Sequence, residues 1–167
     1  MCFAVMVDGK MPTLYWHVDE NGQNLNVNQH EYLKSIQHVL PQIEDLSDKW
    51  WMQDGATCHT TQMVLGYLRA PERFGDRIIS RHTRIPWPAC SPDLNPLDYS
   101  FWGQCERQIA LKKPKGRDEI IRVVNEYAAS LSEELIRSMT NNIIKRARLC
   151  VDQNGGHFEH LLNKNEE

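Results

Sequence analysis

The chain has 167 residues, of which 41% are hydrophobic, enough to bury the core of one globular domain. Its five cysteines are odd in number and form no CxxC pair, so they indicate neither a disulfide framework nor a zinc knuckle. No apolar run approaches the ~18 residues of a membrane span, and the first residues do not resemble a signal peptide. We therefore expect an intracellular protein that does not act at a membrane.

The net charge of −3 argues mildly against a dedicated nucleic-acid-binding module, but the charge is unevenly distributed. Between Arg69 and Arg117 there are ten Lys and Arg residues against five Asp and Glu. This basic middle segment is compatible with a surface that faces nucleic-acid phosphates. Ordinary solvated surface charge explains the count equally well.

The first elements predicted along the chain are a β-hairpin and a helix. Residues 2–7 (CFAVMV) and 13–18 (TLYWHV) are apolar runs on either side of an Asp-Gly-Lys turn at 8–10. Asp-Gly supplies the positive φ that a tight hairpin turn needs. Asn28 is a suitable N-cap for a helix whose apolar residues recur at helical spacing as far as about Pro41.

A strand, a helix and a second strand are predicted next. Residues 50–53 (WWMQ) form an apolar run that stops at Asp54, as a buried strand does at its functional end. The threonines at 60–61 provide caps for the following helix, and residues 77–80 fit another short strand. Strands that alternate with amphipathic helices predict an α/β fold.

A proline-rich block, IPWPACSPDLNPLDYSFWGQCERQI, occupies residues 85–109. Within it Asn95 is a good N-cap and Pro96 a good first helical residue, which places Asp98 in the first turn of a helix. Two further amphipathic helices are predicted at about 118–151.

Asp54 and Asp98 are the candidate metal ligands. Each has a local explanation, because Asp-Gly commonly marks a turn and an acidic residue stabilises the first turn of a helix. Carboxylates on separate elements are also what a hard cation such as Mg²⁺ or Mn²⁺ requires. Two such ions promote in-line phosphoryl transfer.

Two sequence blocks resemble those of mariner-like DDE/DDD transposases. WMQDGATCHT (51–60) and IPWPACSPDLNPLDYSFWG (85–103) are similar to the second and third acidic blocks of that family. CFAVMVDGKMPTLYW resembles the strand pair that precedes them, and LCVDQNGGHFEHLL resembles a C-terminal block. The resemblance implies one partial RNase H-like catalytic domain over 1–167, with C-terminal helices at about 118–151. It also implies a mixed sheet, flanked by helices, in which residues 50–53 lie next to the hairpin.

The resemblance assigns roles to individual residues. Asp54 and Asp98 are implied to be catalytic carboxylates and metal ligands, whereas Asp93 is implied to shape the loop beside them. His59 matches a histidine of the family and is implied to lie near the metal or the DNA backbone. A packed or capping histidine is an equally good interpretation. Further candidates for DNA contacts are Lys112, Lys113 and Lys115.

The sequence also departs from the family pattern. The interval between Asp54 and Asp98 is longer than the family's, and residues 70–76 are the expected place for the extra length. The strand that carries the first catalytic carboxylate in the family is expected upstream of residues 2–7, so the fold is expected to lack it.

Two functional hypotheses follow from the resemblance. The first is a nuclear DNA endonuclease and strand transferase that acts on transposon ends with Mg²⁺ or Mn²⁺. It is expected to form a homodimer, as related transposases do, and to need no small-molecule cofactor. The alternative is a catalytically inactive, truncated or repurposed transposase remnant that at most binds nucleic acid or a protein. We expect this chain alone to bind metal weakly and to be inactive.

Overall fold

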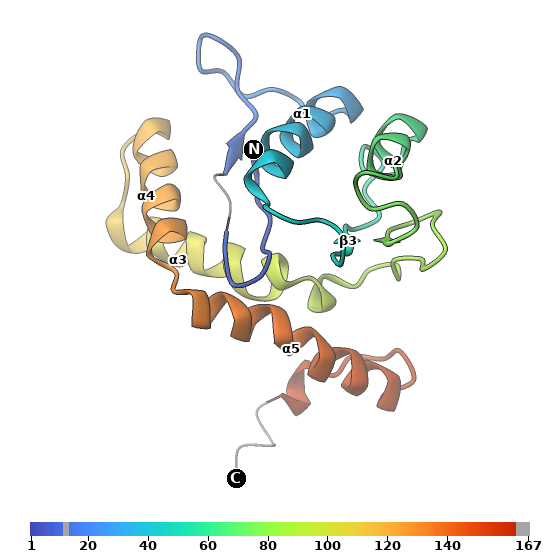
Figure 1. The fold of residues 1–167 in the computed structure, drawn as a ribbon. Helices are drawn as coiled ribbons and strands as arrows, with labels where there is room; N and C mark the ends of the chain where they lie inside the picture. Colours follow the sequence, from blue (N-terminus) through green and yellow to red (C-terminus); the bar gives the residue numbers. More distant parts are fainter. Residues whose placement is uncertain (12–13, 163–167) are drawn as a thin grey trace. The chain divides into compact units, whose positions relative to one another are not determined.

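The computed structural model describes residues 1–11 and 14–162, which form two compact units (Figure 1). The first unit comprises Met1–Val5 and Pro12–Cys90, and the second comprises Met6–Met11 and Ser91–Glu167. The secondary structure of the described residues is mixed α/β, as predicted. No helix in this part of the chain combines the length and the apolar character that a membrane span requires.

The first unit opens with the predicted antiparallel strand pair. Strand β1 (Cys2–Phe3) pairs with β2 (Tyr15–Trp16), with Cys2 opposite Trp16. The regular pairing is shorter than the apolar runs that predict it.

Helix α1 (Gln29–Val39) follows and begins at the predicted cap. The side-chain oxygen of Asn28 accepts hydrogen bonds from the N–H groups of His30 and Glu31, at 2.9 and 3.1 Å. The helix runs into a 3₁₀ turn, η1 (Leu40–Gln42), which contains the proline expected to end it.

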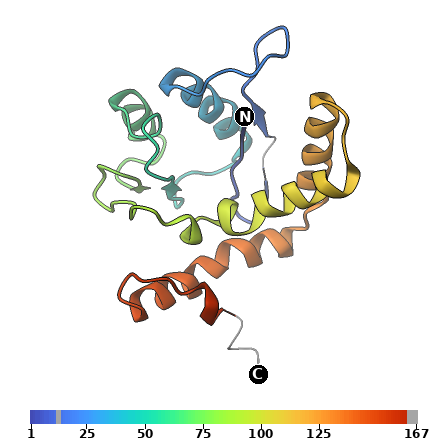
Figure 2. The same cartoon turned by 180° about the vertical axis from the view of Figure 1, so that it is seen from behind.

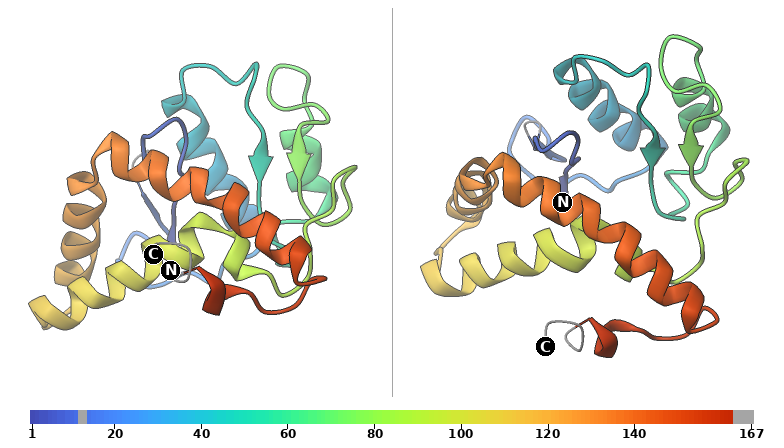
Figure 3. Two further views of the ribbon diagram at one scale, coloured as in Figure 1. Left: turned by 90° about the horizontal axis from the view of Figure 1, so that it is seen from below. Right: turned by 60° about the horizontal axis from the view of Figure 1, so that its bottom comes forward.

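A parallel strand pair follows α1 and forms a βαβ unit. Strand β3 (Trp51–Met52) pairs with β4 (Ile78–Ile79), and helix α2 (Gln62–Leu68) connects them. The left panel of Figure 3 shows the two arrows side by side and pointing the same way. Thr61 caps α2 by accepting the N–H of Val64 at 3.3 Å, as predicted for the threonine pair.

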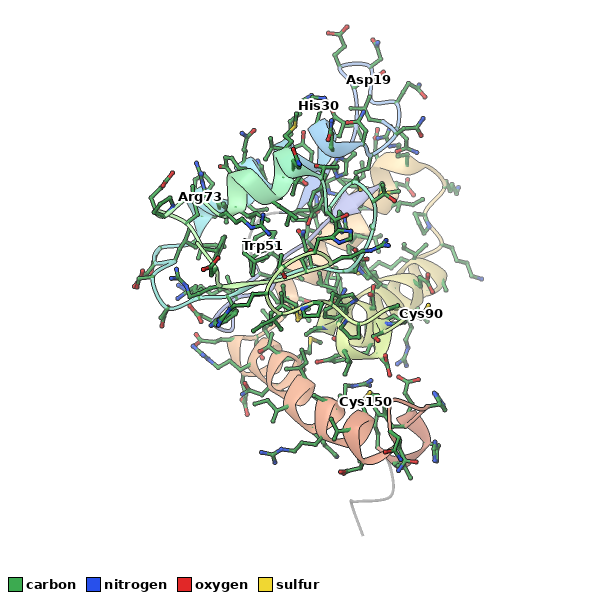
Figure 4. All side chains as sticks on the ribbon, turned by 90° about the vertical axis from the view of Figure 1, so that its right-hand side faces the viewer. Asp19, His30, Trp51, Arg73, Cys90 and Cys150 are labelled. Atoms are coloured by element: carbon green, nitrogen blue, oxygen red, sulfur yellow. The ribbon has the colours of Figure 1, made fainter. Side chains whose placement is uncertain are left out.

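The prediction that residues 50–53 lie next to the hairpin in one sheet is wrong: among the described residues, β3 and the hairpin strands belong to different sheets. Strand β3 is hydrogen-bonded to β4, and β1 to β2, in two separate two-stranded sheets. The apolar run at 50–53 is explained by Trp51, labelled in Figure 4, which is only 5% exposed and packs in a helical core. Figure 1 shows α1 and α2 beside β3. The buried members of this core are Tyr32, Ile36, Leu40, Trp51, Val64, Leu65, Leu68, Phe74 and Ile78.

The second unit contains the tip of the predicted hairpin. Asp8 and Gly9 both have a left-handed backbone, with φ of 50° and 77°. Val7 and Lys10 exchange two backbone hydrogen bonds of 2.9 and 2.8 Å, which makes this the expected tight turn. A Cβ atom at Gly9 would lie 2.5 Å from Cγ of Glu133, so any other residue here would combine a strained backbone with a contact that forces the Glu133 side chain to move.

The remainder of the second unit is helical (Figure 2). A π-helical segment, η3 (Leu97–Phe101), continues into α3 (Trp102–Lys112), which packs against α4 (Arg117–Ser130). Helices α4 and α5 (Glu133–Asp152) occupy the stretch for which the sequence predicts two helices. The buried apolar side chains of this unit include Phe101, Val123, Ile136 and Phe158.

Candidate active site

Asp54 lies two residues after β3, at the carboxyl end of the parallel strand pair. Its Oδ1 accepts the backbone N–H of Ala56 at 3.0 Å and lies 2.5 Å from Nδ1 of His59. The side chain is 45% exposed. Because both contacts end on Oδ1, Oδ2 is the oxygen that is available to a ligand.

The electrostatics of this site favour a charged Asp54. The hydrogen bond from His59 is the main reason why the pKa of Asp54 lies below its usual value, and it outweighs the opposing effect of partial burial. The carboxylate is therefore ionised at neutral pH, which is the state a hard divalent cation binds.

His59 is both packed and bonded. Its ring stacks on that of Tyr32, with centroids 3.9 Å apart and planes 27° from parallel, and its side chain is 21% exposed. The stacking holds the imidazole beside Asp54. A role for His59 near a metal or DNA stays a prediction.

The segment that carries Asp54 is anchored by Gln53, a buried residue that is 7% exposed. Its Oε1 accepts hydrogen bonds from the Tyr32 hydroxyl and the Trp51 indole N–H, both at 2.8 Å. Its Nε2 donates to the carbonyl oxygen of His59 at 2.8 Å and to the Ser80 hydroxyl at 3.0 Å. Both hydrogens and both lone-pair positions of the amide are thus used. In the sequence, Gln53 stands out only as the last residue of the run at 50–53.

In the second unit Asp98 lies in the first turn of η3 and is exposed. Asn95 performs the predicted capping, because its Oδ1 accepts the N–H of Leu97 at 3.2 Å. Its Nδ2 donates to Oδ2 of Asp98 at 2.9 Å. The turn is π-helical, a geometry that occurs frequently at functional sites.

Asp93 lies in a 3₁₀ turn, η2 (Pro92–Leu94), whose anchor the sequence did not indicate. The Arg146 guanidinium donates to the carbonyl oxygen of Asp93 at 2.9 Å and to Glu159 at 3.2 Å. It also lies 4.0 Å from the ring centroid of Tyr99. Arg146 belongs to the helix at Glu133–Asp152 and is only 6% exposed. It fixes the position of the loop that precedes Asp98.

The three candidate lysines lie where α3 ends and α4 begins, and all are exposed. Lys112 forms an ion pair with Glu126 at 2.9 Å. Lys113 has a left-handed backbone (φ 48°) and ends α3. Lys115 donates its backbone N–H to Glu119 at 2.8 Å, and its side-chain ammonium group takes no part in this hydrogen bond. Lys113 and Lys115 are therefore better candidates for DNA contacts than Lys112.

The donor chemistry of the two aspartates fits a hard divalent cation. Asp54 belongs to the first unit and Asp98 to the second, and each presents carboxylate oxygens. Within residues 1–11 and 14–162, no group of three or more His, Cys, Asp or Glu side chains is placed to hold a metal.

A βαβ unit and a helical unit together make up the described part of the chain, and the fold is mixed α/β. No model of a known protein family matches the chain.

Two solved structures illustrate the likeness. The Mos1 transposase catalytic domain with raltegravir and Mg superposes with a TM-score of 0.74 at 18% identity, covering 95% of this chain and 77% of that one. The Mos1 transposase paired-end complex with the left transposon end gives the same TM-score and identity over 95% of this chain and 44% of that one. The resemblance to mariner transposases is therefore confirmed at the level of the fold.

A curated sequence relative is the human histone-lysine N-methyltransferase SETMAR. It is 26% identical over 108 residues, which is 65% of this chain and 14% of SETMAR. The matched region is therefore a small part of SETMAR.

Proposed function

We propose that this chain is a transposase-derived domain that binds DNA and takes part in metal-dependent phosphoryl transfer, with Asp54 and Asp98 as metal ligands. The observation that carries the proposal is the ionised Asp54 carboxylate, held by His59 at the carboxyl end of a parallel strand pair with Oδ2 open to a ligand. Solved Mos1 structures with Mg, with Mn and with a transposon end support it.

A bound Mg²⁺ or Mn²⁺ would activate the attacking hydroxyl or water and stabilise the leaving oxygen. The chain's own residues supply the oxygen ligands and keep them in place. His59 and the Ala56 N–H fix the rotamer of Asp54, and Asn95 fixes that of Asp98. Oriented ligands bind without reorganisation, which is the contribution of the protein at such a site.

The remaining parts of the proposal rest on the resemblance alone. They are a single RNase H-like domain over 1–167, transposon ends as the DNA partner, a homodimer and a nuclear location. Sharing of metal ions further requires the Asp54 and Asp98 carboxylates to approach within about 8 Å, because paired metals lie ~4 Å apart.

Metal binding tests the ligand assignment without any need for activity. With Fe²⁺ and peroxide, we expect oxidative cleavage of the wild-type backbone near both Asp54 and Asp98, which competing Mn²⁺ suppresses. Asp54→Asn or Asp98→Asn should abolish both cuts. Asp93→Asn is the matched control and should retain them. Loss of the cuts in Asp93→Asn, with retention in Asp98→Asn, would show that the third-block ligand is Asp93.

A DNA assay separates the two functional hypotheses. Metal-dependent nicking of a duplex by the purified chain, abolished by Asp98→Asn, supports the enzyme hypothesis. DNA binding without cleavage supports the alternative, a non-catalytic binding module derived from a transposase.

A further inference from the structure

A basic loop, residues 81–84, follows β4 in the first unit and comes close to the segment that carries Asp54. In the parallel pair Trp51 is opposite Ile78 and Met52 opposite Ile79. Asp54 follows the end of β3 by two residues, and Arg81 follows the end of β4 by two residues, in a turn. The last backbone hydrogen bond between the two segments runs from the Gln53 N–H to the carbonyl oxygen of Ile79 at 3.0 Å, and the Gln53 side chain donates to the Ser80 hydroxyl at 3.0 Å.

The Arg81 side chain passes close to the Asp54 segment. Its Cδ lies 3.8 Å from where a Cβ on Gly55 would be. Arg81 does not neutralise Asp54, because no ion pair or hydrogen bond involves Arg81 within the described part of the chain. The hydrogen bonds of Asp54 come instead from His59 and the Ala56 N–H, and both end on Oδ1.

A second unpaired guanidinium belongs to the same loop. Arg84 is exposed, as is Arg81, and it likewise forms no hydrogen bond or ion pair with any described residue. Residues 81–84 therefore carry two guanidinium groups and no acidic residue, so the loop is positively charged. Unpaired arginines present planar forks of N–H donors that match the oxygens of a phosphate.

The loop is held in shape by its own hydrogen bonds. The Thr83 hydroxyl accepts the Ser80 N–H at 3.1 Å and lies 2.8 Å from the carbonyl oxygens of both Ser80 and Ile85. Arg69 donates to the carbonyl of His82 at 3.2 Å. Because these bonds use the backbone and Thr83, the two exposed arginines are left for a ligand on a preorganised loop.

We propose that residues 81–84 form a binding site for DNA backbone phosphates, with Arg81 and Arg84 as the contacting residues and the bound phosphate beside Asp54. The position agrees with the general rule that ligands of parallel α/β sheets bind at the carboxyl ends of the strands. This inference rests on the proposed function, since it assigns the substrate-binding part of the same site.

The test is the salt dependence of binding to a short DNA duplex, measured in EDTA by fluorescence anisotropy. Each phosphate contact contributes about 0.9 to the slope of log Kd against log salt. Arg81→Gln/Arg84→Gln should lower the slope by about 1.8 and weaken binding at least tenfold at low salt. The control Lys145→Gln/Arg148→Gln makes the same change in net charge on exposed residues of α5 and should change the slope much less.

A second measurement tests the position beside Asp54. In EDTA, Asp54→Asn should tighten binding roughly fivefold in the wild-type background, because it removes a negative charge next to the phosphate. The gain should disappear when Arg81 and Arg84 are replaced.

An unchanged slope in the arginine double variant, with wild-type DNA binding intact, would overturn this assignment and leave the proposed function standing. If Asp54→Asn tightened binding equally with and without the two arginines, that result would also overturn the assignment and leave the proposed function standing. A wild-type chain that binds no DNA at low salt would overturn both the assignment and the proposed function.

Discussion

Replacing the buried amide of Gln53 by an apolar side chain of similar size should destabilise the first unit strongly. Gln53→Leu removes both acceptor and both donor functions at once. Three of the groups that lose Gln53 as a hydrogen-bond partner are buried: the Tyr32 hydroxyl, the Trp51 indole N–H and the Ser80 hydroxyl. Among the described hydrogen bonds, the Tyr32 hydroxyl and the Trp51 indole N–H have no acceptor other than Gln53, so the substitution leaves both donors unpaired.

The size of the effect follows from the number of groups left unpaired. A buried polar group without a partner costs about 1–3 kcal/mol. Losses at neighbouring groups are not fully additive, and the buried leucine contributes about 1–2 kcal/mol of apolar burial in return. We therefore expect a net loss of about 3 kcal/mol in the free energy of unfolding, a large part of the ~5–15 kcal/mol typical of a domain.

Equilibrium unfolding in urea, followed by tryptophan fluorescence, measures this loss. The matched control Gln62→Leu changes an exposed glutamine on α2 and should alter stability by less than about 0.5 kcal/mol. Tyr32→Phe removes one bond and leaves Gln53 with its partner Trp51, so it should cost about 1 kcal/mol. A loss below about 1 kcal/mol for Gln53→Leu would refute the account of Gln53 as the anchor.

Three further predictions address other parts of the chain. Gly9→Ala should lower the thermal midpoint, because it combines a left-handed backbone with a 2.5 Å overlap, whereas Gly103→Ala, in an open helical position, should raise it. Burial holds the pKa of His17 below its usual value, so the folded state is more stable when His17 is neutral than when it is protonated. That contribution is complete above the unfolded pKa of about 6.5 and is lost as the pH falls through the folded pKa. Between pH 7.5 and 5.5 the free energy of unfolding, measured by urea titration, should therefore fall less for His17→Gln than for the wild type. The surface control His30→Gln should behave like the wild type. Arg146→Met should cost about 2–4 kcal/mol in urea titrations, since it leaves the Asp93 carbonyl without its buried donor, and a cost near zero would contradict that role.

The features that the sequence predicted well are those decided within a few residues. The Asp-Gly turn forms because it needs only a positive φ at adjacent positions. Asn28, Thr61 and Asn95 act as caps because a cap bonds an N–H two or three residues away. For the same reason Asp54 could be placed at a strand end and Asp98 in a first turn.

Features that depend on residues far apart in the sequence were less predictable. An apolar run such as 50–53 indicates burial but does not specify its partner, so the pairing of β3 with β4 instead of the hairpin could not be read from it. The contact between His59 and Tyr32 joins residues 27 positions apart through ring stacking, which leaves no periodic signal. The meeting of Asp54 and Asp98 at one metal site belongs to the same class and stays a prediction.

The anchors of the two sequence blocks were missed for a common physical reason. Glutamine and arginine are usually surface residues, so nothing in the local sequence marks Gln53 or Arg146 as buried. Each holds its loop through a backbone carbonyl, that of His59 in one case and that of Asp93 in the other. A bond to the backbone imposes no requirement on the side chains of the loop itself. The anchor can therefore fix the path of the chain next to Asp54 or before Asp98 while the loop residues themselves are determined by other demands, such as binding a metal or a phosphate.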